Sequence, residues 1–208
     1  MTKEDRQMNP LLTLLSQSPR SPATDRRSIR HLCASGPAPR RRCLRPSVES
    51  LEGRTLLSTI TVDTFGDVVN SGDLHTSLRE AIAQAASTLA EADTIVLPTG
   101  TYALALGELA INDSSGKVTI QSGGVATIDA GGTSRVLTIA AGSEVELIGL
   151  TITGGFVANG GGLSNSGTVT ITASTLSGNS ASVGGGIYIN AGTVAIADST
   201  LSGNSAIF

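Results

Sequence analysis

The end of the chain repeats itself, and this repeat restricts the possible folds more than any other feature of the sequence. The block Ser174–Ala181 returns unchanged at Ser199–Ala206, 25 residues later. The block Gly160–Leu163 returns as Gly184–Ile187, 24 residues later, so one residue is inserted between the two blocks. A period of this length is typical of a solenoid, in which each repeat forms one coil and contacts only its neighbours.

The content of the repeat indicates the type of solenoid. Short segments such as Val169–Ile171 alternate apolar and polar residues, and Gly, Asn and Ser separate them, which is the pattern of strands joined by tight turns. Neither a helical spacing nor a leucine-rich consensus occurs inside the unit. Three short strands and three turns fit one coil. We therefore expect an all-β fold, a right-handed parallel β-helix, over residues 94–208, with roughly four to five coils stacked at ~4.8 Å.

Each repeated position then has a predicted role. The apolar positions should form inward-facing stacks: Val145, Leu147, Ile152, Val169, Ile171, Leu176, Val194, Ile196 and Leu201. The residues between the paired strand positions should point outward: Glu146, Thr170 and Ala195. Asn179 and Asn204 should lie one above the other and bond from coil to coil. The glycine triplets should relieve crowding where backbones approach, and the segments 118–120 and 136–139 look like degenerate coils.

The composition predicts a core of thin apolar layers and not a core of large aromatic side chains. The chain has three Phe, two Tyr and no Trp, so the core must consist of Val, Ile, Leu and Ala. Both cysteines, Cys33 and Cys43, precede residue 58, which excludes a disulfide framework for the repeats.

One helix is expected before the coils, over about 77–89. Ser77 and Glu80 form a capping-box pattern, and apolar residues recur at helical spacing on one face: Leu78, Ile82, Ala85, Ala86 and Leu89. A short amphipathic helix of this kind can cover the exposed end of the first coil. We therefore divide the chain into a leader (1–57), a strand and capping helix (58–93) and the coils (94–208).

Residues 1–57 differ from the rest in charge and composition. They hold 11 Lys and Arg against 5 Asp and Glu, whereas the remainder holds 3 against 12. Their Arg-, Ser- and Pro-rich stretches predict a disordered basic leader. A basic tail can bind nucleic acid, but aromatic residues are absent from it, which favours a solvated or processed leader and no nucleic-acid partner. The apolar stretch 11–15 is too short for an ordinary signal peptide, and no transmembrane segment is present in the sequence.

Two segments resemble known families. Leu51, Glu52, Arg54, Leu56 and Leu57 resemble the LEPR-XLL motif of bacterial secreted or envelope proteins, with Gly53 in place of its proline. Residues 76–82, Thr-Ser-Leu-Arg-Glu-Ala-Ile, resemble the CSLREAI motif, which precedes a β-helix, with Thr76 in place of its cysteine. The resemblance covers roughly residues 60–208 and implies a secreted or cell-envelope location. The segment before residue 40 is longer than this context needs, which suggests that translation begins later.

No catalytic, cofactor-binding or metal-binding residues are predicted. Asp63, Asp67 and Asp73 lack the spacing of a calcium loop and suit turns instead. Arg79 and Glu80 suit a surface charge and a cap, His75 a surface or turn position, and Asp129 and Arg135 a structural turn. Glu146 aligns with Thr170 and Ala195, and Asp198 with Ala173 and Gly149, so acids do not gather on one face as glycoside hydrolysis requires. The glycine triplets lack the residues of a phosphate loop.

Three functions remain open. The first is a non-catalytic structural or surface module, the N-terminal part of a secreted β-helix stalk or adhesin. The second is a fragment of a polysaccharide lyase or hydrolase whose catalytic residues lie outside these residues, because many such enzymes use this fold. The third is glycan binding, with cell-surface or extracellular polysaccharide as partner, although aromatic platforms are scarce. The chain stops partway through a coil, which suggests a fragment and predicts self-association through the open C-terminal end.

Overall fold

The computed structural model describes residues 58–70, 72–87 and 92–207. These residues belong to one of the two units into which the chain divides, residues 50–208. The predictions for the leader, Cys33 and Cys43 and the motif at 51–57 lie outside the described residues.

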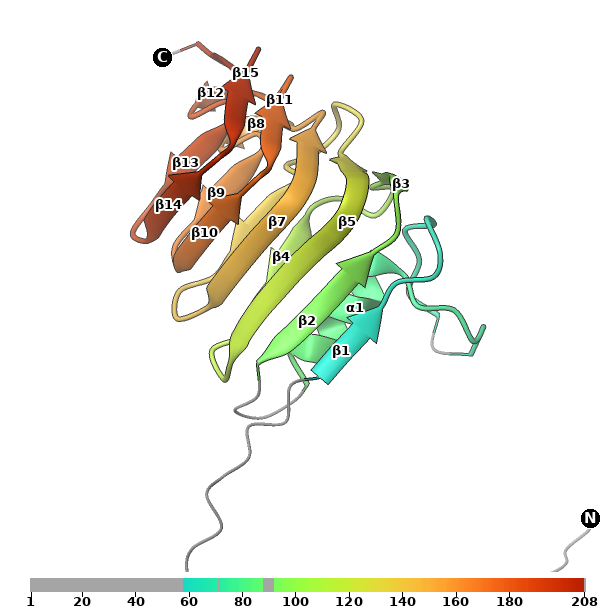
Figure 1. The fold of residues 1–208 in the computed structure, drawn as a ribbon. Coiled ribbons are helices and arrows are strands. Elements are labelled where there is room, and N and C mark those ends of the chain that lie inside the picture. Colours follow the sequence, from blue (N-terminus) through green and yellow to red (C-terminus); the bar gives the residue numbers. More distant parts are fainter. Residues whose placement is uncertain (1–57, 71, 88–91, 208) are drawn as a thin grey trace, which may run out of the picture. The chain divides into compact units, whose positions relative to one another are not determined.

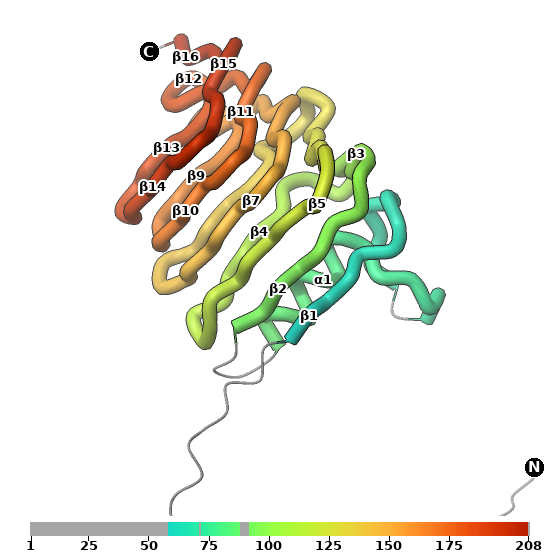
Figure 2. The backbone as a smooth tube through the Cα atoms, in the orientation of Figure 1, coloured from blue at the N-terminus to red at the C-terminus, as the bar shows by residue number. Residues whose placement is uncertain are grey.

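The described residues form a right-handed parallel β-solenoid, as predicted, and the chain winds from the first coil to the last without reversing (Figures 1 and 2). The stack has three parallel sheets. The long sheet contains β1 (Ser58–Thr61), β2 (Asp93–Leu97), β3 (Gly100–Ala103), β5 (Lys117–Asp129), β7 (Glu144–Thr153), β10 (Thr168–Thr172), β11 (Thr175–Ser177), β14 (Thr193–Ala197) and β15 (Thr200–Ser202). The second sheet contains β8 (Phe156–Asn159), β12 (Ser180–Val183) and β16 (Ser205–Ala206). The third contains β4 (Leu109–Ile111), β6 (Leu137–Ile139), β9 (Leu163–Asn165) and β13 (Ile187–Ile189).

The solenoid begins earlier than the predicted boundary at residue 94. Strand β1 pairs in parallel with β2, with Ile60 opposite Ile95, so residues 58–61 are already the first strand of the long sheet. The alternation of Ile60 and Val62 with polar neighbours, which predicted one strand here, places both side chains in the core.

Helix α1 (Leu78–Ala85) covers the interior of the first coils and is shorter than the predicted 77–89. Ser77 caps it through the predicted capping box, and Leu78, Ala81, Ile82 and Ala85 join the same core as Ile60 and Val62. Ala86 was predicted on the buried face but is the exposed C-cap residue, because each residue advances the helix by roughly 100°, which carries Ala86 past the face that holds Ala85. Leu89 lies outside the described residues.

The inward stacks have the predicted register. Val145, Val169 and Val194 are aligned from coil to coil, and the same holds for the series through Leu147 and through Ile152. Segment 118–120 forms the preceding layer of the same stack. Segment 136–139 was interpreted as a separate coil, but its strand β6 lies in the third sheet, beneath β9, and completes the coil that β5 begins. Period-two alternation is the same in every sheet and therefore cannot assign a strand to one of them.

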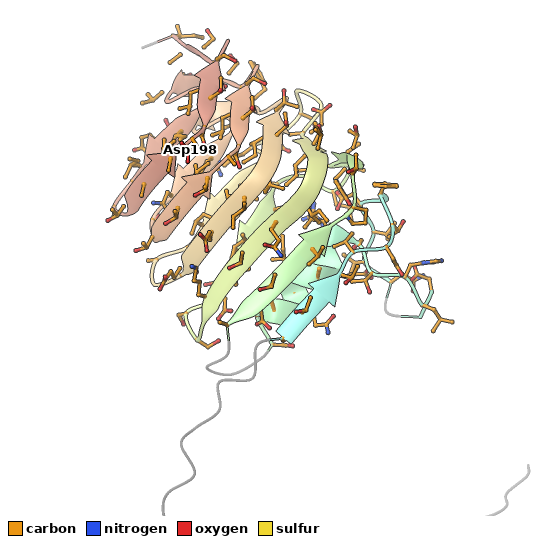
Figure 3. All side chains as sticks on the ribbon, viewed as in Figure 1. Asp198 is labelled. Carbon is orange, nitrogen blue, oxygen red and sulfur yellow. The ribbon has the colours of Figure 1, made fainter. Side chains whose placement is uncertain are left out.

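The coil that begins with β10 has four strands, β10 to β13, where three were predicted. A single residue with positive φ lies at the same place in the long sheet's part of three successive coils: Gly149 (68°), Ala173 (49°) and Asp198 (50°). Ala173 lies between β10 and β11, and Asp198 between β14 and β15, whereas Gly149 lies within β7. Asp198 is labelled in Figure 3, in the last coil between β14 and β15. The left-handed conformation bends the chain within the sheet, and in the later coils the register is the same on both sides of the bend. Between β5 and β7 the register shifts at this point, between Gln121 and Ala126.

Two ladders of polar side chains run parallel to the solenoid axis. In the predicted asparagine ladder, Asn179 Nδ2 donates to Asn204 Oδ1 (3.0 Å) and Asn179 Oδ1 accepts from the Gly155 N–H (2.9 Å). A serine ladder, which was not predicted, lies at the neighbouring turn: Ser174 Oγ accepts from the Leu150 N–H, and Ser199 Oγ from the Ser174 N–H (both 3.1 Å). The buried backbone groups at these turns are satisfied by side chains of the next coil.

The glycine triplets lie where neighbouring coils approach most closely, as predicted. A Cβ on Gly161 would lie 2.6 Å from the carbonyl oxygen of Gly185, and a Cβ on Gly162 would lie 2.6 Å from that of Gly186. The inserted residue between repeats is absorbed in the turn 190–192, after β13 and before β14.

In the last coil, Ile196 and Leu201 are 45% and 47% exposed, although both belong to inward stacks. Association through this end stays a prediction. Within the described part of the chain, no helix has the length and apolar character needed to cross a membrane.

Candidate functional site

An enclosed ion pair lies at the N-terminal end of the solenoid. Arg79 on α1 binds both carboxylate oxygens of Asp67, at 2.7 and 3.0 Å, and donates to the backbone carbonyls of Gly107 (2.7 Å) and Glu108 (2.9 Å). The Asp67 side chain is only 3% exposed. The prediction that Arg79 is a surface charge is therefore wrong. The Arg79 side chain bonds the loop before α1 and the loop before β4 to the helix.

The ionisation of Asp67 follows from this environment. Burial disfavours its charge, but the hydrogen bonds from Arg79 and from the Leu106 N–H outweigh burial and lower the pKa of Asp67 below its ordinary value. The pKa of Glu80 is also lowered, because its carboxylate accepts from the backbone N–H groups of Ser77 and Asn70. Both acids are thus ionised partners in structural contacts, and Glu80 caps the helix as predicted.

The remaining groups of this end serve the turns. Asp73 Oδ1 accepts from the His75 N–H (3.0 Å), two residues further on, which confirms the turn interpretation for Asp73. Asp63 Oδ1 accepts from the Thr76 N–H (2.7 Å), 13 residues away, so Asp63 joins distant parts of the chain and does not bond within its own turn. His75 is exposed, as predicted, and its Nδ1 lies 3.6 Å from Asp63 Oδ1. Among the described residues no cluster of three or more His, Cys, Asp or Glu could hold a metal ion.

Asp129 and Arg135 do not face one another as a catalytic pair. Asp129 Oδ1 accepts from the Gly131 N–H (2.8 Å), as turn chemistry predicts. Arg135 pairs with Glu108 (2.5 Å) and donates to the carbonyls of Asn159 and Gly160 in the next coil. The interpretation of both residues as structural is confirmed.

Two acids lie on the same outward face of β7. Glu144 and Glu146 are two residues apart, which places them roughly 6.6 Å from each other along the strand. This separation suits the carboxyl pair of an inverting glycosidase. However, Glu146 is held by Lys117 (2.5 Å) and Glu144 is exposed, so neither acid lies in the apolar enclosure that keeps a general acid protonated. Glu146 aligns with Thr170 and Ala195, as predicted.

A depression of about 800 Å³ lies beside α1 and the loop before it. Its lining includes Val69, Leu74, His75 and Glu80. Glu80 is committed to its two backbone N–H groups, so this depression brings together no pair of free acid and base groups among the residues that line it.

A regular set of hydroxyl groups covers the second half of the long sheet. Outward threonines at the same position of successive coils are in register with one another: Thr101, Thr127, Thr151, Thr175 and Thr200. The next outward position forms a second column: Ala103, Asp129, Thr153, Ser177 and Ser202. We call these two columns the hydroxyl face. This face was not predicted, although Thr-x-Thr or Thr-x-Ser recurs at the same place in three repeats, and this recurrence is a signal for it in the sequence.

Comparison of the chain with models of known families, with curated proteins and with solved structures gives no match.

Proposed function

We propose that these residues form a non-catalytic structural or surface module, the N-terminal part of a secreted or cell-envelope β-helix protein that serves as a stalk or adhesin. The observation that carries the proposal is the use of the charged groups. Each of the three Arg and Lys side chains in the described residues is held in an ion pair: Arg79 with Asp67, Lys117 with Glu146, and Arg135 with Glu108.

This arrangement supports a structural role in two ways. Lyases and glycosidases need acids and bases that are free to exchange protons with a substrate, whereas these groups are tied to each other and to backbone atoms. The repeated outward surface of the later coils is instead rich in Ser and Thr. A stack of coils held in one register by buried apolar columns and polar ladders is suited to act as a stiff spacer.

The location rests on the resemblance of residues 51–57 to the LEPR-XLL motif and of residues 76–82 to CSLREAI. A test is to express the epitope-tagged full chain in its native cells and to follow it by fractionation. We expect the wild type in the envelope or the medium, and a Leu56→Ala, Leu57→Ala variant retained inside the cell. A Leu14→Ala, Leu15→Ala variant is the matched control, because it alters equally apolar residues of the leader outside the motif.

Wild-type protein confined to the cytosolic fraction would refute the proposed location. The non-catalytic role is tested separately by incubating the purified protein with neutral and acidic polysaccharides. If the wild type releases reducing ends or unsaturated sugars and a Glu144→Gln, Glu146→Gln variant does not, the non-catalytic role is refuted and the hydrolase or lyase alternative is favoured.

A further inference from the structure

The hydroxyl face is an ordered two-dimensional array. Along the solenoid axis its threonines follow one another at ~4.8 Å, the spacing of hydrogen-bonded strands. Across the axis the two columns are two residues apart on each strand, roughly 6.6 Å. The register between neighbouring strands is uninterrupted over this segment in all five coils. The stack of β3, β5, β7, β11 and β15 is visible in Figure 1.

The array is also rigid. Threonine is β-branched and restricted at χ1, so its hydroxyl and methyl groups have few positions to choose from. In the first four coils of the face the residue between the two columns is buried: Tyr102 is 3% exposed, and Ile128, Ile152 and Leu176 have no exposed surface. In these four coils the face therefore lies directly over the buried core.

The hydroxyl groups are directed to solvent. None of the five threonine hydroxyls of the first column bonds to another protein group in residues 58–70, 72–87 and 92–207. The second column carries hydroxyls in the last three coils, at Thr153, Ser177 and Ser202, and one charged residue, Asp129. Asp129 is turned toward the Gly131 N–H.

This chemistry restricts what the face can bind. It has no aromatic side chain on which a sugar ring could stack and no cation for an acidic polymer. What it offers is a neutral grid of hydroxyl groups, each beside a methyl group in the threonine column. Water molecules bonded to these hydroxyls inherit the spacing of the grid in both directions. Those two spacings lie close to the repeat distances between oxygen atoms on a prism face of hexagonal ice.

We propose that the hydroxyl face binds ice. The bound ligand is the crystal surface, whose first water layer continues the waters held over the threonine column, and the methyl groups fill the spaces between them. The contact of any single coil is weak, and adsorption depends on the number of aligned coils. This function is independent of the secreted-module proposal, and each can fail without the other.

The experiment is a measurement of ice growth in solutions of the purified full chain. We expect the wild type to shape ice crystals into facets and to depress the freezing point below the melting point by a gap that grows with protein concentration. Thr151→Tyr, at the centre of the threonine column, should abolish both effects, because a bulky ring lifts the crystal surface off the grid. Thr175→Tyr is a second variant of the same kind, in case the first does not fold.

Thr170→Tyr is the matched control. Thr170 is an outward threonine of the same long sheet, but it lies in the first half of the coil, between Glu146 and Ala195, and outside the hydroxyl face. Circular dichroism establishes that each variant keeps the wild-type fold. Round, unshaped crystals in wild-type solution would overturn the proposal, and so would full activity in both Thr151→Tyr and Thr175→Tyr.

Discussion

Replacing Asn179 by alanine tests whether the asparagine ladder holds the coils together. The Asn179 side chain is fully buried. Its Oδ1 accepts from the Gly155 N–H at 2.9 Å, and its Nδ2 donates to the carbonyl of Ile152 at 3.0 Å as well as to Asn204 Oδ1. Alanine removes all of these contacts and supplies no replacement.

The expected magnitude follows from the groups left behind. An unsatisfied buried N–H such as that of Gly155 costs about 1–3 kcal/mol. The Ile152 carbonyl loses one of its hydrogen bonds, and the missing side-chain atoms leave a small cavity, so we expect a total loss of about 2–4 kcal/mol in the free energy of unfolding. With a urea dependence of about 2 kcal/mol per molar, the midpoint should fall by roughly 1–2 M.

The assay is urea unfolding of the full chain followed by circular dichroism, with exchange of the Gly155 amide hydrogen as a local measurement. Amide exchange is needed because solenoids can open coil by coil. Asn190→Ala is the control: Asn190 is exposed and makes a single side-chain bond, to Ser166 Oγ at 3.3 Å, so its loss should cost no more than about 0.5 kcal/mol. If Asn179→Ala is as mild as Asn190→Ala and leaves Gly155 exchange unchanged, the ladder does not stabilise the stack.

Three other predictions concern the N-terminal ion pair and the bend in the long sheet. Arg79→Leu leaves the buried Asp67 carboxylate unpaired and should cost about 3 kcal/mol or more by urea unfolding, whereas Arg79→Leu combined with Asp67→Leu should recover much of that loss. The pKa of Asp67 is lower in the folded protein than its ordinary value near 4, so the ion pair stabilises the fold fully above the ordinary pKa and loses this contribution as pH falls through the folded-state pKa. The difference in unfolding free energy between wild type and Arg79→Leu should therefore shrink in acid. A difference that stays constant with pH would contradict this reasoning. Ala173→Gly should raise the thermal unfolding midpoint, since φ of Ala173 is +49° and the left-handed conformation costs a residue with a Cβ about 1 kcal/mol. Gly149→Ala should lower the midpoint, because the new Cβ would lie 2.8 Å from the carbonyl oxygen of Ser122. Equal effects of the two substitutions would refute the role of these positions as the bend in the long sheet.

The parts of the structure that repeat could be predicted from the sequence. Ser174–Ala181 and Ser199–Ala206 are identical, so their alignment, the stacked asparagines and the inward columns follow from parallel stacking alone. Segment 136–139 was misplaced because its early coil has diverged and only its pairing with β4 and β9 assigns it to the third sheet.

Contacts between distant, unrepeated segments could not be predicted. The pairing of Arg79 with Asp67 joins residues 12 apart through a loop without regular structure, and the carbonyls of Gly107 and Glu108 that complete it lie 28 and 29 residues further on. No periodic pattern in the sequence predicts that these distant residues contact one another. The early end of α1 was missed for a similar reason: the apolar spacing continues to Leu89, while the helix itself ends at Ala85.

The duplicated register has a consequence for the gene. The surface that one late coil presents to the next reproduces the surface that it receives. Asn204 Oδ1 accepts from the Asn179 N–H and its Nδ2 donates to the Leu176 carbonyl, just as Asn179 Oδ1 accepts from the Gly155 N–H and its Nδ2 donates to the Ile152 carbonyl. Replication slippage or unequal crossing over between the two copies would therefore insert or delete one whole coil and create a junction that already exists in the protein. Such a locus can change the length of its product in steps of ~4.8 Å without having to evolve a new interface.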